Sequence, residues 1–222
     1  MTKRLQLTRA LCVLYTSSVV GSATVLYDEN IGGQVSSGTP NADFSLLLSP
    51  SDLGALSLGD NTVIGTTNSE GVTVGDFFSF DVPIGMHLSH FYVDDMGYAF
   101  DANGDERFQF HFIALDDGRE LSFVQPGNTA LFASLIEAAE VEVANSEGAP
   151  KDLLVDYASG GQYGAGLSAP LSAGTYNVFF QETSGTPISY EFRFVTELVP
   201  EPSTSLLLAL SSLFILSRRS KY

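Results

Sequence analysis

The chain has 222 residues and a formal net charge of −16, with 26 Asp and Glu against 10 Lys and Arg. Six of the ten basic residues lie in the first nine or the last five positions, so residues 24–197 carry 25 acidic and four basic side chains. A surface of this kind repels nucleic acid, because binding to phosphates requires clustered Lys and Arg. The 16 Phe and 9 Tyr nevertheless predict a packed core rather than a disordered chain.

Residues 1–23 are predicted to be a secretory signal peptide. Three basic residues precede an apolar stretch at 10–20, and Gly21-Ser22-Ala23 provides the small side chains of a cleavage site. The stretch is too short for a transmembrane anchor, which needs about 20 apolar residues. The only cysteine, Cys12, lies in this segment. The mature chain is therefore expected to contain no disulfide and no Cys-bound metal.

The body of the chain, residues 24–197, is expected to be one β-sandwich domain. Apolar and polar residues alternate at 78–82, 108–112, 176–180 and 188–194. Alternation of period two places one face of a strand in a core and the other in water. Several such segments separated by Gly- and Pro-containing turns predict antiparallel strands packed as a sandwich.

Two turns are predicted to close hairpins. Asn103-Gly104 can adopt the positive φ angles of a tight turn, and residues 184–187, Ser-Gly-Thr-Pro, are predicted to join the last two strands. One segment departs from the β pattern, because the apolar residues of 128–140 have helical spacing behind a possible N-cap, Asn128. We expect a short amphipathic helix there, followed by a return to a strand at Val141-Glu142-Val143.

Several phrases of the body resemble a known type of module. Residues 58–65, residues 75–83 and residues 171–178 resemble the jelly-roll β-sandwich modules of secreted bacterial proteins, of the pre-peptidase C-terminal type. The resemblance implies an all-β, jelly-roll-like antiparallel sandwich, and it supplies no catalytic residues. We therefore expect no enzymatic activity. The insert at 125–150, with the one short helix expected from its spacing, is where this chain departs from the family's pattern.

The C-terminal region, residues 198–222, resembles the PEP-CTERM sorting signal of Gram-negative bacteria. The motif Pro200, Glu201 and Pro202 is followed by an apolar run at 205–217 and by the basic residues Arg218, Arg219 and Lys221. The resemblance implies processing by a membrane-embedded exosortase. As a helix, Leu206 to Leu216 spans only about 16 Å, against about 30 Å of hydrocarbon. We therefore expect transient retention in the inner membrane, with the basic residues on the cytoplasmic side.

A calcium site is one candidate for the acidic surface. Asp101, Asn103 and Asp105 place oxygen ligands at alternate positions of a loop, as calcium sites often do. Gly104 precedes the third ligand instead of following it, so the EF-hand pattern does not fit. A plain polar hairpin is the alternative interpretation.

The histidines His87 and His90 are three positions apart in the sequence. This spacing places their side chains on opposite faces of a strand and argues against a zinc site.

Glycan binding is the other candidate. Jelly rolls often bind sugars through exposed aromatic rings, and the tyrosines considered for this role are Tyr92, Tyr98, Tyr157 and Tyr163. Tyr157 and Tyr163, which flank a glycine-rich loop, are the predicted glycan-binding residues.

The sequence thus predicts an exported structural or adhesive protein of the cell envelope or exopolysaccharide matrix. A carbohydrate-binding module at the cell surface is the alternative.

Overall fold

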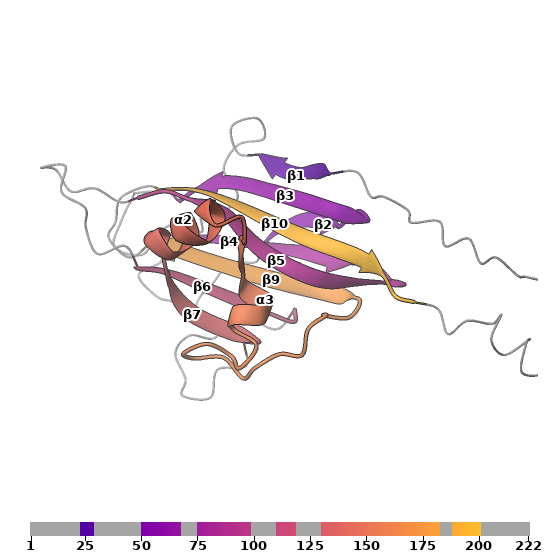
Figure 1. Ribbon diagram of the computed structural model, residues 1–222. Helices are drawn as coiled ribbons and strands as arrows, with labels where there is room; N and C mark the ends of the chain where they lie inside the picture. Colours follow the sequence, from indigo (N-terminus) through magenta and orange to yellow (C-terminus); the bar gives the residue numbers. More distant parts are fainter. Residues whose placement is uncertain are drawn as a thin grey trace, which may run out of the picture.

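In the residues that the structure describes, the protein is mostly β, with two five-stranded sheets and two short helices (Figure 1). The computed structural model describes residues 23–28, 50–67, 75–98, 110–118, 130–182 and 188–200. The strands are β1 (Thr24–Asp28), β2 (Ser51–Ala55), β3 (Gly59–Thr66), β4 (Gly75–Val82), β5 (Met86–Met96), β6 (Phe110–Asp116), β7 (Phe132–Glu137), β8 (Lys151–Asp152), β9 (Gly174–Glu182) and β10 (Ser189–Leu198). The helices are α2 (Ala138–Ser146) and α3 (Leu153–Asp156).

The two sheets are mixed rather than purely antiparallel. The first has the strand order β1-β3-β10-β5-β8, and the second has the order β2-β4-β9-β6-β7. Strands β3 to β10 pair in an antiparallel manner. The exceptions are two edge strands, because β1 is parallel to β3 and β2 is parallel to β4. The expectation of a β-sandwich is therefore confirmed, while the expectation that every pair is antiparallel is wrong at these edges.

Aromatic side chains fill the space between the sheets. Phe194 of β10 lies 4.5 Å from Phe80 of β4, measured between ring centroids, and 4.5 Å from Phe91 of β5. Phe180 of β9 meets Phe192 of β10 edge to face at 5.2 Å. All five rings are fully buried. They come from the alternating segments and from β5, so the period-two pattern identified much of the core.

The predicted helix at 128–140 is wrong for most of its length. Phe132–Glu137 forms strand β7, which pairs with β6, and the helix α2 begins only at Ala138. Apolar residues cover both faces of β7, and such a run cannot be distinguished from a buried helix by its spacing. Val141-Glu142-Val143, predicted as a strand, lies in α2, where Val141 is buried. The helix α3 has no counterpart in the sequence prediction.

The predicted hairpin at 184–187 is also wrong. The strands on either side of it, β9 and β10, belong to different sheets and do not pair. The strands β5 and β6, which precede and follow Asn103-Gly104, also belong to different sheets, but residues 99–109 are not described, so the predicted turn at Asn103-Gly104 stays a prediction. The turn residues themselves lie outside the described residues. Turn composition predicts that a chain reverses direction, but it does not distinguish a hairpin from a crossing between two packed sheets.

The first and last strands meet at one end of the sandwich, which we call the exit end. Thr24 of β1 and Phe194 of β10 both lie opposite Asn61 of β3, from its two sides. Because β1 is parallel to β3 and β10 is antiparallel to it, β1 begins where β10 ends (Figure 1). Within the part of the chain that the structure describes, no helix has the length and apolar character needed to cross a membrane.

Candidate functional site

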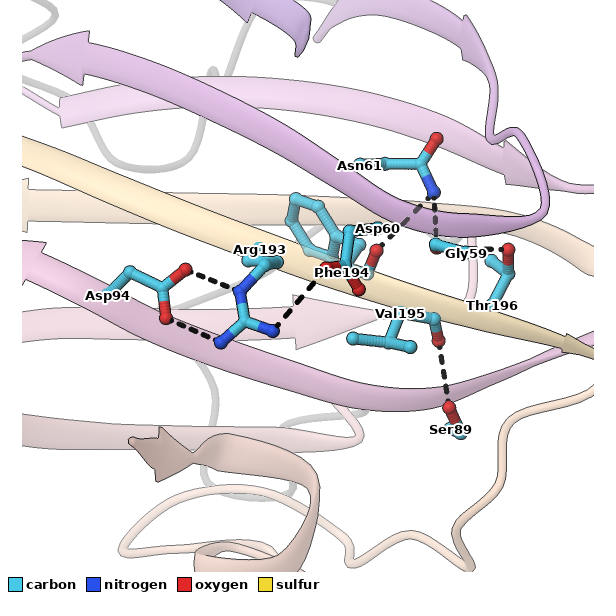
Figure 2. A network of polar contacts seen from close by, with 9 residues as sticks. All are labelled: Gly59, Asp60, Asn61, Ser89, Asp94, Arg193, Phe194, Val195 and Thr196. Atoms are coloured by element: carbon cyan, nitrogen blue, oxygen red, sulfur yellow. Dashed lines mark hydrogen bonds and ion pairs between the residues drawn. The ribbon is translucent and has the colours of Figure 1, made fainter. Parts of the chain in front are cut away.

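The outer face of the first sheet carries a row of polar side chains centred on Arg193. Its guanidinium makes two hydrogen bonds to Asp94, 2.5 Å from Nε to Oδ2 and 2.9 Å from Nη2 to Oδ1 (Figure 2). Asp60 lies 3.8 Å from Nη1. The pairing with Asp94 raises the already high pKa of Arg193, so this side chain is a permanent cation. Fork geometry of this kind fixes both side chains more firmly than a single ion pair does.

Tyr92 lies beside Arg193, because the two residues are opposite each other in the β10–β5 pair. The guanidinium carbon is 4.5 Å from the centre of the Tyr92 ring. His90, two residues earlier on β5, stacks on the same ring at 5.1 Å. The stacking surface of Tyr92 is therefore already used within the protein. Burial and the negative charge of Asp152 raise the pKa of the Tyr92 hydroxyl.

Asp152 connects this row to the short helix α3. Its carboxylate accepts hydrogen bonds from the backbone N–H of Phe91 at 3.2 Å and of Leu154 at 3.1 Å, the second of which caps α3. Nδ1 of His90 lies 2.6 Å from the other carboxylate oxygen. A single side chain thus joins β5, β8 and α3.

A groove of about 580 Å³ lies next to Tyr92, between α2, the turn at 148–150 and α3. Lys151 is one of the residues that line this groove. Its Nζ lies 3.1 Å from a carboxylate oxygen of Glu140 and 3.1 Å from one of Asp156. Burial lowers the pKa of Lys151, but the hydrogen bonds to Glu140 and Asp156 outweigh this effect and raise it above its ordinary value. The groove therefore holds a fixed cation between two carboxylates that are both partly open to solvent.

Tyr157 and Tyr163, selected from the sequence as glycan-binding residues, face opposite sides of the second sheet. The Tyr157 hydroxyl donates to the carbonyl of Leu135 at 3.1 Å, and its ring packs on the core residue Phe132 at 5.5 Å. The ring of Tyr163 is 56% exposed and lies 6.4 Å from Phe112, which is part of a separate cluster on the outer face. Tyr157 therefore holds α3 against β7, while Tyr163 presents an open ring.

The glycine-rich loop between these tyrosines is attached to β7. Gly160 accepts a hydrogen bond from the backbone N–H of Ala133 at 3.1 Å, and the N–H of Tyr163 donates to the carbonyl of Ala133 at 3.0 Å. The loop thus continues the second sheet beyond its edge strand, although it forms no regular strand.

The other two tyrosines considered from the sequence also have internal partners. Tyr92 belongs to the row described above, and Tyr98 donates a hydrogen bond to the Glu142 carboxylate on α2. Sequence reasoning missed the importance of Arg193 and Lys151. Both are among only four basic residues of the body. In so acidic a domain each basic side chain has many carboxylates with which it can pair. The small number of basic residues was therefore a sequence signal that each of them takes part in ion pairs.

The predicted calcium ligands Asp101, Asn103 and Asp105 lie outside the described residues, so this site stays a prediction. Among the ranges that the structure describes, no three His, Cys, Asp or Glu side chains come together in a way that would hold a metal. His87 and His90 on β5 have separate partners, Glu197 and Asp152.

Pro200 is the last described residue of the chain. The N–H of Val199, just before it, donates to the carbonyl of Gly85 at 2.9 Å, which ties the end of β10 to the turn between β4 and β5. The remaining predicted sorting residues lie beyond the described part; they are Glu201, Pro202, Arg218, Arg219 and Lys221.

Comparison of the chain with known protein families, with curated proteins and with solved structures gives no match.

Proposed function

We propose that this protein is exported and sorted to the surface of a Gram-negative cell or its exopolysaccharide matrix, where it has a structural or adhesive role. The observation that carries the proposal is the position of the two predicted signals relative to the fold. The first strand begins at Thr24, one residue after the predicted cleavage site, and the last ends at Leu198, two residues before Pro200. Both predicted processing sites are thus adjacent to the sandwich without interrupting it.

The common exit end supports the same proposal. A precursor with a signal peptide and a C-terminal apolar run would be held at the membrane by both of its ends. Because Thr24 and Phe194 lie on either side of Asn61, both attachments would leave one end of the folded body. A domain of this kind can fold while it is still attached, and cleavage at either end removes no strand.

We infer further that strands β3 to β10 form a jelly roll, a fold used by many surface and lectin domains. In a jelly roll a long hairpin of nested antiparallel pairs wraps into two sheets. The pairs β3–β10, β4–β9, β5–β8 and β6–β7 are nested in this way, and all four are antiparallel. The strands β1 and β2 extend the two sheets at one edge. The extended aromatic core fits a scaffold role without disulfides.

The sorting proposal is tested by replacing Pro200-Glu201-Pro202 with three alanines in a host that carries an exosortase. We expect the variant to remain unprocessed in the inner membrane, while the wild type is cleaved near the motif. Alanines at Ser203-Thr204-Ser205 provide the matched control and are expected to leave processing intact. Wild-type surface protein with a C-terminus still ending at Tyr222 in mass spectrometry would contradict the proposal.

Carbohydrate binding is the second candidate, and the groove beside Tyr92 favours it. The carboxylates of Glu140 and Asp156 are positioned to accept hydrogen bonds from sugar hydroxyls, and Lys151 is positioned to donate. The open ring of Tyr163 is a separate stacking surface. A glycan array that compares the wild type with Glu140→Ala and with Tyr163→Ala tests the groove and the exposed ring separately. Binding that neither substitution weakens would exclude both as the sugar site.

A further inference from the structure

Three exposed apolar side chains gather at the exit end of the sandwich. Ile84 is 97% exposed, Leu198 is 52% exposed and Val199 is 46% exposed. Met86, opposite Leu198 in the β5–β10 pair, follows the turn that carries Ile84. The hydrogen bond from the N–H of Val199 to the carbonyl of Gly85 holds the two segments side by side. We call Ile84, Leu198 and Val199 the apolar tip.

The turn presents Ile84 to solvent in a defined way. The N–H of Met86 donates to the carbonyl of Pro83 at 3.0 Å, and Gly85 has a φ of 86°, as the third position of a type II turn requires. The remaining central position belongs to Ile84. This turn joins a strand of one sheet to a strand of the other, so Ile84 projects beyond the end of the sandwich. A nearly fully exposed Ile on a rigid turn has no role in the core.

The sequence that follows indicates what the apolar tip meets. From Val199 to Leu206, the first Leu of the apolar run, the chain advances seven residues. Seven extended residues reach at most about 25 Å. When the run is in a bilayer, the exit end therefore stays within about that distance of the lipid surface. So short a tether keeps the local concentration of tip and lipid high, and even a weak contact becomes populated.

We propose that the apolar tip rests in the interfacial layer of a zwitterionic lipid surface while the C-terminal run holds the protein at the membrane. This inference depends on the membrane retention proposed above. Apolar side chains favour the boundary between headgroups and acyl chains because burial there removes them from water. Glu197, exposed beside the tip, and the acidic body disfavour anionic lipid. The contact orients the sandwich with its exit end toward the membrane.

Fluorescence quenching in lipid vesicles tests the orientation. The full chain with Cys12→Ser receives one new cysteine, either Ile84→Cys or Val155→Cys, and an environment-sensitive label. Val155 is a matched control, because it is 62% exposed but lies on α3. In phosphatidylcholine vesicles containing nitroxide-labelled lipid, we expect quenching at position 84 to exceed that at 155 by roughly threefold or more. Equal quenching at the two positions would overturn the proposal.

A flotation measurement separates this inference from the retention on which it rests. Leu208→Lys with Leu213→Lys interrupts the apolar run and should reduce flotation of the full chain with the vesicles. If flotation does not depend on the run, the retention itself fails. If flotation depends on the run but position 84 is not quenched, only the tip contact fails. Slower processing of Ile84→Asp in cells without lipid quenching would instead mean that the tip contacts the processing enzyme, which also overturns the lipid proposal.

Discussion

Gly65 of β3 lies directly opposite Tyr190 of β10, and a Cβ atom at Gly65 would occupy the space of the Tyr190 ring. The Tyr190 side chain is almost fully buried, packs on the tilted ring of Phe192 at 4.6 Å and meets Phe180 edge to face at 4.9 Å. The ring can take this place only because position 65 has no side chain. The glycine is therefore part of the core packing, although it is not at a turn.

Substitution of Gly65 by Ala is predicted to destabilise the protein by about 1–3 kcal/mol, because the methyl group forces the Tyr190 ring out of a packed position. Gly174→Ala is the matched control, since a Cβ there would meet its nearest atom, on the Tyr176 ring, at an ordinary 3.9 Å. Urea unfolding of the two variants measures the difference. A loss at Gly65→Ala no larger than that at Gly174→Ala would mean that the core adapts to the methyl group.

Arg193→Ala is predicted to destabilise the fold by about 1–2 kcal/mol. The substitution leaves Asp94 without its two hydrogen bonds from the guanidinium and uncovers the Tyr92 ring. Arg193→Lys keeps the positive charge but loses the fork geometry and the stacking, so it should recover less than half of the loss. Full recovery by Lys in urea unfolding would show that only the charge at this position matters.

Glu191 is predicted to make stability depend on pH. Burial, together with the nearby negative charges of Asp94 and Asp95, raises the pKa of the Glu191 carboxyl above its ordinary value of 4.5, although Arg193 opposes the shift. The folded state therefore holds this proton more tightly than the unfolded state does. The stabilising contribution is complete below pH 4.5 and is lost as pH rises through the folded pKa.

Glu191→Gln removes this titration. We expect the variant to match the wild type at pH 4 or below and to become the more stable protein as pH rises toward 7. Urea midpoints measured across this range provide the test, with Glu147→Gln at the exposed C-terminal end of α2 as the control. A constant difference between Glu191→Gln and the wild type at all pH values would contradict the expected role of the Glu191 charge.

The strands were predictable from sequence because their burial is one-sided. In β10, the buried residues Tyr190, Phe192 and Phe194 alternate with less buried positions. In β4 and β9 only the polarity alternates, because Ser79 and Asn177 on their outer faces are buried as well, but this alternation was sufficient to identify both strands. In β7 it failed, because that strand has apolar residues on both faces and the pairing with β6, not the local pattern, decides its conformation. The sheet to which each strand belongs was not predictable, because it depends on contacts between distant segments.

The polar row was less predictable than the core. Tyr92 was considered for its aromatic ring, whereas its partner Arg193 is 101 positions away in sequence. Only the β5–β10 register brings the two together. The separation of Tyr157 from Tyr163 has a similar origin, because a few residues of loop pass from one face of a sheet to the other. The sequence places both tyrosines beside the glycine-rich loop, and only the packing of that loop along β7 reveals that their rings face different clusters.

Asp152 of β8 provides the last prediction, because its carboxylate has two partners on β5 and one on α3. Asp152→Ala removes the N-cap of α3, the bond to the N–H of Phe91 and the contact with His90. We expect a loss of about 1–2 kcal/mol. Asp152→Asn keeps an acceptor of nearly the same shape and should lose less, while Asp95→Asn on the exposed surface should have little effect. Urea unfolding ranks the three variants. If Asp152→Ala is no less stable than Asp95→Asn, then Asp152 does not hold β5, β8 and α3 together.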